Sequence, residues 1–292
     1  MFFKLSRSQI FTHRGLEPSR PDFWPESSYE AFQDHLARGY GIEFDPNFCY
    51  DGIVVSHDAS LKRITEGRDE RNFSDVSVEE LASLRYGPNP EKQGRIPTLD
   101  EVLGMISSNS SALSAMHFKA KYQGISNMRV LISYIEKHKL LDRLVIFDVK
   151  PEIAHFMKLT NNRLMLAPSV AHPYDIKRYG SVVGNSLVST QDAISFKDVY
   201  DWAWLDEWDT ADEEGKEKRL YTAETFDTLR AEGYKIALVT PELHGTSPGL
   251  YGGESHKDAA SRGTLFRRIR EIIELRPDAI CTDYPEEAAA GL

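Results

Sequence analysis

Ile10-Phe11-Thr12-His13-Arg14-Gly15 opens the stretch of sequence that decides the fold of this chain, and the stretch ends at Asp58. It contains two more short polar signatures, Glu43-Phe44-Asp45 and Ser56-His57-Asp58. Each of the three signatures lies at the end of a short apolar run that predicts a strand. Because charged groups at the ends of buried strands are costly without compensation, the signatures indicate one shared site for an ion or a charged ligand.

The composition describes a globular protein and narrows its partners. Of the 292 residues, 41% are apolar and 27% are charged, and the formal net charge is −10. The sequence has no block of Lys or Arg, so neither a nucleic acid nor an anionic membrane is an expected partner. An anionic substrate therefore needs local positive charge, either from a metal ion or from a few placed Arg and Lys side chains.

The N-terminus and the cysteines predict a soluble, cytoplasmic protein. Met1 to Arg7 lacks the apolar core of a signal peptide, and no stretch approaches the roughly 18–20 apolar residues that span a bilayer. Cys281 lies in an apolar run, where a free thiol behaves as a small core residue, so a disulfide with Cys49 is not expected. We expect no stable membrane association and either a monomer or a homodimer.

Strand-like and helix-like patterns alternate along almost the whole chain, in about eight β-then-α units, with the assignment around 174–190 left open. Short apolar strands between amphipathic helices are typical of a parallel sheet buried on both faces. Eight such units close into a (β/α)8 TIM barrel, whereas a doubly wound sheet usually has about five or six strands. The expected fold is therefore α/β, one TIM barrel domain over residues 1–292. Strands are expected at 9–12, 40–45, 113–119, 143–149, 164–170, 202–208, 235–240 and 278–283, and helices at 28–38, 98–106, 127–139, 151–159, 174–179, 196–201, 223–232 and 256–275.

Residues 59–95 interrupt this alternation. They are rich in charge and in turn residues such as Gly87-Pro88-Asn89-Pro90, around one short helix that opens with the capping box Ser77-Val78-Glu79-Glu80. A predicted hairpin over residues 50–57 precedes them. We interpret 59–95 as an insertion after the second strand that stands as a small cap over one end of the barrel.

Ionisable side chains gather at the predicted carboxyl ends of the strands, where TIM barrels carry their chemistry. They are His13, Glu43, Asp45, Lys119, Asp148, Asp206, Glu207 and Asp283. Glu43 and Asp45 are two apart on one strand and share a face, where two carboxylates can hold a proton or a divalent cation. Oxygen ligands favour Mg²⁺ or Ca²⁺. An internal ion pair with Arg14 or Lys119 is the alternative.

His13, His57 and Arg14 add reactive groups to these carboxylates. An imidazole titrates near neutral pH, so two histidines beside a metal suit general acid and base chemistry. The guanidinium of Arg14 offers a bidentate fork for a phosphate.

The motifs, taken as a set, match a known family. They are His13-Arg14-Gly15, Pro25-Glu26-Ser27-Ser28 with Ala31-Phe32, Glu43-Phe44-Asp45, Asp51-Gly52, His57-Asp58 with Leu61 and Arg63, Thr65-x-Gly67, Ile96-Pro97-Thr98-Leu99 with Glu101-Val102-Leu103, and Asp278 to Pro285. This set resembles the glycerophosphodiester phosphodiesterase family, within the phospholipase C-like phosphodiesterase superfamily of TIM barrels. The resemblance is dense over residues 10–119 and returns at 278–285, whereas residues 125–275 follow loosely.

The resemblance implies a TIM barrel with a cap after its second strand and metal-dependent hydrolysis of a phosphodiester. The residues at matching positions are His13 and His57 as the acid/base pair, Arg14 and Lys119 as phosphate ligands, and Glu43 and Asp45 as ligands of one divalent metal ion. In the family mechanism, a substrate hydroxyl next to the phosphate attacks phosphorus and expels the alcohol. Water then opens the resulting cyclic phosphate.

The sequence departs from the family pattern on the third strand. Family members carry a Glu two residues before the lysine as a third metal ligand, and His117 stands at that position here. The expected cofactor is one divalent ion, Mg²⁺ or Ca²⁺ for the carboxylates, with Mn²⁺ or Zn²⁺ as alternatives because an imidazole suits them better. Asp148, on the neighbouring strand, is the other candidate for the third ligand.

Two later segments predict a different substrate pocket. Residues 238–245 replace the Trp-Thr-x-Asn segment usual in the family, and together with residues 204–207 they predict substrate-binding roles for Trp204, Glu207 and Glu242. Further aromatic side chains, Trp202, Trp208 and Tyr251, would suit a polyhydroxylated group such as a sugar. The alternative for each tryptophan is packing inside the barrel and against the helices.

These observations predict a phosphoric diester hydrolase that converts a small glycerol- or sugar-phosphodiester into a phosphomonoester and an alcohol. A phospholipase C- or D-like enzyme acting on a lipid head group is the alternative enzyme, and the lack of an apolar anchor or basic rim counts against it. The non-enzyme alternative, motivated by His117, is a catalytically weak barrel that binds a sugar-phosphodiester, such as an agrocinopine-like opine or a glycan fragment.

Overall fold

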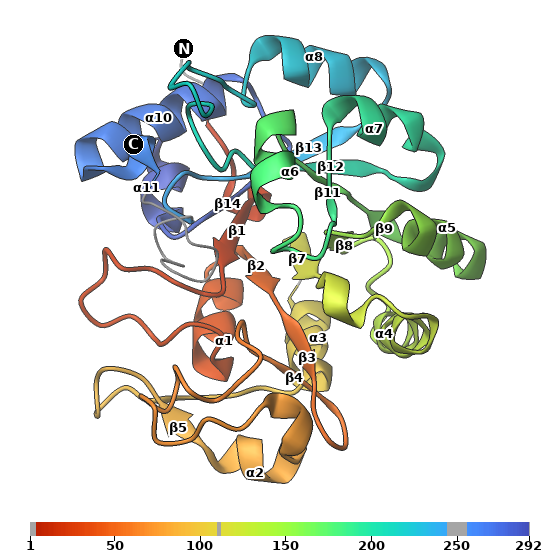
Figure 1. Ribbon diagram of the computed structural model, residues 1–292. Helices are drawn as coiled ribbons and strands as arrows, with labels where there is room; N and C mark the ends of the chain where they lie inside the picture. Colours follow the sequence, from red (N-terminus) through yellow and green to blue (C-terminus); the bar gives the residue numbers. More distant parts are fainter. Residues whose placement is uncertain (1–3, 110–111, 244–255, 292) are drawn as a thin grey trace.

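The computed structural model describes residues 4–109, 112–243 and 256–291. At its centre lies a parallel sheet of ten strands in the order β11-β10-β12-β13-β14-β1-β2-β7-β8-β9, which curls so that helices surround it (Figure 1). The strands are β1 (Ile10–His13), β2 (Gly41–Phe44), β7 (Ser114–His117), β8 (Leu144–Phe147), β9 (Met165–Leu166), β10 (Ser169–Val170), β11 (Leu187–Val188), β12 (Trp202–Leu205), β13 (Lys235–Val239) and β14 (Ala279–Thr282).

β9 and β10 are two halves of one strand, and together they close the sheet. Only Ala167 and Pro168 separate them, and a proline has no N–H to donate. The N–H of Ala167 still bonds the carbonyl of Ile146 on β8 (2.9 Å), and the carbonyl of Pro168 accepts from the N–H of Trp204 on β12 (3.1 Å). With β9 and β10 counted as one strand and the two-residue β11 as an addition, the ten strands form a ring of eight. The predicted TIM barrel is confirmed.

Side chains on the barrel strands alternate between the barrel interior and the surrounding helices, as the period of two in a strand requires. On β1, Ile10 packs in the outer hydrophobic cluster and Phe11 in the inner one. On β12, Trp204 is inside and Leu205 is outside. The same alternation places His13, two residues after Phe11, at the inner mouth of the barrel.

The helices cover the outside of the barrel and begin where the sequence offers side-chain caps. The Ser28 hydroxyl accepts the N–H of Ala31, and Thr98 and Glu101 form the predicted capping box. The α-helices are α1 (Tyr29–Ala37), α3 (Leu99–Ser108), α4 (Ile125–Lys137), α5 (Pro151–Thr160), α6 (Pro173–Tyr179), α7 (Thr190–Ser195), α8 (Ala223–Ala231), α10 (Arg262–Glu274) and α11 (Pro285–Ala290). Among the described residues, no helix is both long and apolar enough to cross a membrane.

Two helices differ from their predicted bounds because a cap acts earlier or later in the chain. The helix predicted at 196–201 is instead α7, since Ser189 and Asp192 form a capping box that starts it at Thr190, and only the 3-10 turn η4 (Lys197–Val199) remains. The helix predicted at 256–275 starts at Arg262, after the N-cap Ser261.

Residues 46–98, which include the predicted cap, pack beside the barrel around a small core of their own. They form the antiparallel pair β3 (Pro46–Phe48) and β4 (Ile53–Val55), the 3-10 turn η2 (Phe73–Asp75), helix α2 (Val78–Ser83) and the pair β5 (Arg85–Tyr86) and β6 (Gly94–Arg95). The core contains Val54, Leu61, Phe73, Val76, Leu81, Tyr86 and Ile96. In Figure 1, α2 and β5 lie at the periphery, beyond β3 and β4.

Gly41 is a position where the fold of the barrel tolerates no side chain. A Cβ there would collide with the backbone carbonyl oxygen of Leu113 and lie 2.9 Å from the ring of Phe11. We expect Gly41→Ala to lower the free energy of unfolding by at least about 3 kcal/mol, because backbone cannot move aside as a side chain can. Urea denaturation measures this. Gly263→Ala is the control, since nothing lies within 4 Å of its added Cβ, and we expect it to be neutral or stabilising.

Candidate active site

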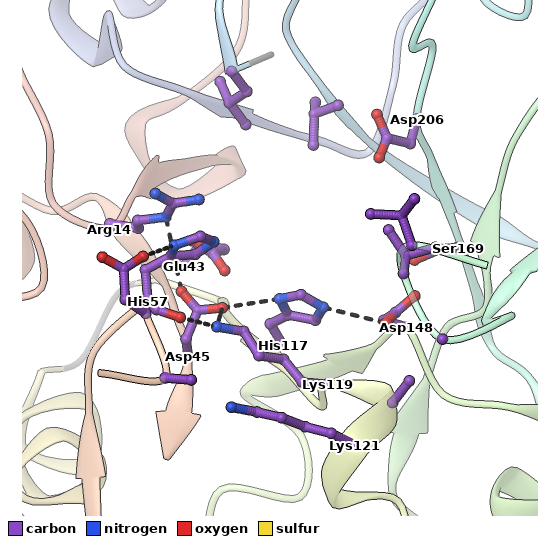
Figure 2. A pocket seen from close by; sticks show the side chains of 18 of the residues that line it. Arg14, Glu43, Asp45, His57, His117, Lys119, Lys121, Asp148, Ser169 and Asp206 are labelled. Atoms are coloured by element: carbon purple, nitrogen blue, oxygen red, sulfur yellow. Dashed lines mark hydrogen bonds and ion pairs between the residues drawn. The ribbon is translucent and has the colours of Figure 1, made fainter. Parts of the chain in front are cut away.

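A cavity of about 1080 Å³ opens at the carboxyl ends of the barrel strands, and most of the predicted site residues line it. These are His13, Arg14, Glu43, Asp45, His57, His117, Lys119 and Trp204. Lys121, Asp148, Ser169 and Asp206 also line it. Figure 2 shows Arg14, Glu43 and His57 on one side of the space, Asp148, Ser169 and Asp206 on the other, and His117 between them.

Three non-glycine residues of the lining, Glu66 among them, have a strained backbone. Arg14, just after β1, has φ of 54°, and Asp148, just after β8, has φ of 64°. Residues other than glycine rarely adopt this left-handed backbone conformation, and each instance costs about 1–3 kcal/mol. Gly15 follows with φ of 71°, and a Cβ there would lie 2.8 Å from that of Ala31, so the turn after β1 packs directly on α1. The turn thereby fixes Arg14 at the rim of the cavity.

His57 is held by its neighbour Asp58. Its Nδ1 lies 2.8 Å from Oδ1 of Asp58. The other oxygen of Asp58, Oδ2, accepts from Nε of Arg63. Burial lowers the pKa of His57 to about 4, and the positive charge of Arg14 acts in the same direction. The ring is therefore neutral at pH 7. With its Nδ1–H donated to Asp58, Nε2 is a proton acceptor, as a general base requires.

His13 is held by a different carboxylate. Asp283 follows β14, which pairs with β1, and its Oδ1 lies 2.9 Å from Nδ1 of His13. The two side chains are only 1% and 6% exposed, respectively. A carboxylate at Nδ1 orients the ring and can stabilise the positive charge that it carries when it acts as a general acid. The two histidines therefore meet the cavity from different electrostatic environments.

Asp45 lies among several cationic groups. Its Oδ1 is 2.9 Å from Nδ1 of His117 and 3.1 Å from Nζ of Lys119, and its Oδ2 is 3.8 Å from Nε of Arg14. Burial opposes its charge, but Lys119 and the nearby histidines keep the pKa of Asp45 well below its usual range. Glu43 behaves oppositely, because burial and the charge of Asp45 raise its pKa to about 8. Glu43 therefore carries a proton at neutral pH in the absence of a cation.

His117 bridges two carboxylates across the floor of the cavity. Its Nδ1 contacts Asp45, and its Nε2 lies 3.2 Å from Oδ2 of Asp148 (Figure 2). Burial opposes a charge on the ring, but the hydrogen bonds to Asp148 and Asp45 outweigh it and raise the pKa of His117 to about 9. The two predicted candidates for a third metal ligand, His117 and Asp148, are thus bonded to each other.

Glu43, Asp45 and His117 are suited to hold a divalent cation. Their ligand atoms lie within 4.8 Å of one another. Oε2 of Glu43 and Oδ2 of Asp45 are buried and have no hydrogen-bond partner in the part of the chain that the structure describes. A cation would satisfy both oxygens and take the place of the proton on Glu43. His117 can join as a ligand only as a neutral ring that releases one of its carboxylates.

Glu207, for which substrate binding is predicted, does not line the cavity. Glu207 follows Leu205 by two residues, so its side chain points out of the barrel as that of Leu205 does. The side chain of Trp204 points into the barrel. Oε2 of Glu207 accepts the N–H of Tyr221 (3.2 Å), and its Oε1 lies 3.4 Å from both Arg219 and Arg268. Glu207 therefore joins the end of β12 to the outer helix layer.

Glu242 also lies outside the cavity lining, in contrast to its predicted substrate contact. Its Oε1 accepts from the hydroxyls of Thr240 and Thr282, each at 2.6 Å, and from the N–H of Asp283 at 3.1 Å. These partners turn its carboxyl group toward the end of β14, behind His13.

Trp204 lines the cavity but offers no open ring face to a sugar. Phe147 stacks on it at 3.8 Å between ring centroids, and Phe11 stacks at 5.9 Å with nearly parallel planes. Trp202 packs in the barrel interior, whereas Trp208 lines the cavity and stacks on Tyr179. Packing is thus the main role of the first two tryptophans. His244 and Tyr251, both in the predicted pocket segments, lie outside the described residues.

Sequence reasoning left three partners of the site without a role. Asp283 holds His13, Glu26 pairs with both Arg14 and Arg63, and Lys121 lines the cavity. Asp283 and Glu26 belong to motifs of the sequence, which indicates that they matter. The sequence does not indicate which side chains they contact. Lys121 lies in the 3-10 helix η3 (Ala120–Tyr122), whose N-cap is Lys119.

The geometry of the site defines the class of protein, and similarity to known proteins identifies the family. A barrel that gathers two histidines, several carboxylates and basic side chains at the carboxyl ends of its strands belongs to the class of TIM-barrel enzymes. The model of the glycerophosphoryl diester phosphodiesterase family matches residues 13–287, and the chain belongs to this family. The predicted family and the predicted enzyme class, a phosphodiesterase, are confirmed. No curated protein sequence matches the chain.

Solved structures share the fold at low sequence identity. A candidate glycerophosphodiester phosphodiesterase from Galdieria sulphuraria has a TM-score of 0.67 at 17% identity, covering 99% of this chain and 98% of that one. A glycerophosphoryl diester phosphodiesterase from Parabacteroides distasonis has a TM-score of 0.65 at 21% identity, with 99% and 88% covered. A phosphodiesterase from Oleispira antarctica, solved with the product sn-glycerol-3-phosphate, has a TM-score of 0.64 at 16% identity, with 97% and 96% covered.

The raised pKa of Glu43 predicts a pH-dependent response to divalent cations. Because Glu43 holds its proton up to about pH 8, a cation must displace it, so binding strengthens as the pH rises. We expect Mg²⁺ or Mn²⁺ to raise the melting temperature more at pH 8 than at pH 6. A metal-ion concentration of about 100 times the Kd would raise the free energy of unfolding by about 2.7 kcal/mol.

Thermal unfolding with and without the metal chloride measures this response. Asp45→Asn should abolish it. Glu207→Gln is the matched control, because Glu207 belongs to another acidic cluster, with His256 and Asp258, that Arg219 and Arg268 already neutralise. A response that survives in Asp45→Asn, or that disappears in Glu207→Gln, contradicts the assignment of the metal site.

Proposed function

We propose that the chain hydrolyses a small glycerol- or sugar-phosphodiester to a phosphomonoester and an alcohol, with His57 and His13 as the acid/base pair. The observation that carries this proposal is that each of the two histidines in one cavity has a carboxylate of its own at Nδ1. Asp58 holds a neutral His57, and Asp283 orients His13. Two such groups on one cavity can move protons in opposite directions within a single displacement.

In the first step, a substrate hydroxyl next to the phosphate attacks phosphorus. Nε2 of His57 takes the proton of that hydroxyl as the new P–O bond forms. His13 gives a proton to the alcohol oxygen as its P–O bond breaks, and a cyclic phosphate remains. In the second step His13 takes a proton from water, whose oxygen bonds to phosphorus, and His57 returns its proton to the ring oxygen that leaves. Both histidines end in their starting states.

Arg14 and Lys119 are the proposed phosphate ligands, with Lys121 as a third basic side chain on the same wall. All three are fixed charges aimed at the place where negative charge grows on the phosphoryl oxygens. A divalent ion held by Glu43, Asp45 and His117 would add further positive charge there when bound. The carboxylates favour Mg²⁺ or Ca²⁺, and an imidazole ligand would favour Mn²⁺ or Zn²⁺.

The inserted segment is the proposed cap over the substrate. Six of its residues border the cavity, namely Ala59, Ser60, Lys62, Arg63, Glu66 and Gly67. Arg63 also connects the segment to the catalytic side, through ion pairs with Asp58 and Glu26. A substrate that reaches beyond the phosphate would contact this wall.

Removing either histidine tests the proposed chemistry. We expect His13→Ala and His57→Ala each to lower kcat by about 10²–10⁴-fold, the range that general acid and base groups contribute. The assay measures phosphomonoester release from a panel of glycerol- and sugar-phosphodiesters, with and without a chelator. His138→Ala is the control, since His138 binds Asp100 on the outside of the barrel. Full activity in either cavity variant would contradict the mechanism.

A set of apolar side chains in the cavity lining favours a second candidate, a diester whose alcohol carries an apolar chain. They are Val182, Val183, Leu187, Val239 and Leu243. Val182 is 50% exposed, so an apolar group could enter along it. A monoacylated glycerophosphodiester would bury such a chain there, whereas a sugar would leave these apolar side chains exposed to water.

Val182→Asp distinguishes the two substrate types. For a monoacyl diester, used below its micelle concentration, we expect kcat/KM to fall about tenfold, because one apolar contact of about 1.4 kcal/mol is lost. For a glycerol diester the fall should be less than about twofold. Val130→Asp, on the outer face of α4 and 41% exposed, is the matched control. Equal effects on both diesters would rule out the apolar subsite.

A further inference from the structure

Glu242 lies behind the proposed acid/base residue His13 and reaches it through Asp283. β13, β14 and β1 are consecutive neighbours in the barrel, and Glu242, Asp283 and His13 lie at or just beyond their carboxyl ends. Oε1 of Glu242 accepts the N–H of Asp283, and Oδ1 of Asp283 contacts Nδ1 of His13. A continuous polar path therefore runs from Glu242 to the cavity.

The two carboxyl groups of this path are buried, and each leaves one oxygen without a partner. Glu242 is 6% exposed and Asp283 is fully buried. Oε2 of Glu242 and Oδ2 of Asp283 have no hydrogen-bond partner anywhere in the described residues. Two buried carboxylates in one cluster repel each other, and a proton on one of them removes that repulsion.

Among the residues that the structure describes, too little positive charge surrounds the pair to ionise both groups. Burial and the charge of Asp283 raise the pKa of Glu242. Burial also raises the pKa of Asp283, with Arg14 opposing and Glu26 adding to the effect. The ionisable groups that face the pair are His13, Arg14, Glu26, Cys281 and Tyr284. The negative charge of Glu43 also acts on the thiol of Cys281.

We propose that Glu242 and Asp283 hold one proton between them and that this buried pair positions His13. Glu242 is thus a positioning residue that touches neither substrate nor metal, and its role rests on the proposed acid/base function of His13. While the pair keeps its proton, Asp283 faces His13 with one negative charge and a fixed orientation. Loss of that proton places two like charges side by side and pushes the carboxylate away from the ring.

Glu242→Gln tests the pair because it keeps the accepting oxygen and removes the ionisation. The amide oxygen can still accept from Thr240, Thr282 and the N–H of Asp283, whereas Glu242→Ala removes all three bonds. In the wild type, kcat should fall as the pH rises above neutrality and the pair loses its proton. In Glu242→Gln this contribution to the fall is absent, so the ratio of the variant kcat to the wild-type kcat should rise at least about tenfold between pH 6 and pH 9. KM should change less than about twofold, since Glu242 does not line the cavity.

A stability series gives a second readout that needs no substrate. A carboxyl group whose pKa is raised by folding keeps a proton that the unfolded chain releases, so the free energy of unfolding falls as the pH rises through that window. Glu242→Gln removes this loss, and its melting temperature relative to the wild type should increase steadily from pH 5 to pH 8.

Glu17→Gln is the matched control for a buried glutamate. Burial opposes the charge of Glu17, but hydrogen bonds from His35 and Arg38 outweigh it and lower its pKa to about 2. Because Glu17 is ionised in both the folded and the unfolded chain above about pH 6, its loss should lower the melting temperature by the same amount from pH 6 to pH 8. All proteins are measured under one fixed metal condition.

Parallel pH profiles of Glu242→Gln and the wild type, in both kcat and melting temperature, would overturn the proposal. A uniform loss of activity in Glu242→Gln at every pH, with no change in the shape of the stability curve, would also overturn it and leave Glu242 as a hydrogen-bond acceptor only. If the wild type hydrolyses no phosphodiester, the proposed function fails. The stability series still decides in that case whether the proton-sharing pair exists.

Discussion

The negative charge of Asp45, buried at the mouth of the barrel, is the constraint on which the arrangement of the site depends. A buried carboxylate must be compensated, and three cationic side chains from the ends of two strands converge on this one, namely Arg14 after β1 and His117 and Lys119 at the end of β7. The compensation leaves Glu43 with no charge partner of its own, so it keeps a proton or takes a metal ion. The proposed phosphate ligands and the proposed metal ligands therefore occupy one connected cluster around Asp45.

Closure of the ring produces the second organising feature, the separate support of the two histidines. His57 has a local partner, since Asp58 is the next residue in the chain. His13 depends on Asp283, 270 residues away, and the two meet only because β14 pairs with β1. Events that loosen the last strand of the barrel therefore reach His13 and spare His57. The buried Glu242 extends this dependence to the turn after β13.

The site stores strain that a barrel built for stability alone would avoid. Arg14 and Asp148 adopt left-handed backbone angles, and buried oxygens of Glu43, Asp45, Glu242 and Asp283 have no hydrogen-bond partner among the described residues. The wide apolar layer between strands and helices offsets these costs, because every residue of β1, β2 and β8 is buried. Such features gather where ligands bind, since a ligand supplies the missing partner.

The sequence by itself determined the elements that depend on neighbours along the chain. Alternation of apolar strands and amphipathic helices predicted the barrel, the box Thr98–Glu101 predicted the start of α3, and the spacing of Glu43 and Asp45 predicted their common face. Only the tertiary structure decided the partners: Asp283 for His13, and Asp148 for His117. It also turned Glu207 and Glu242 out of the cavity and stacked Phe147 and Phe11 on Trp204. The physical reason is that strand periodicity fixes the direction of a side chain, whereas its contacts depend on how the strands close into a ring.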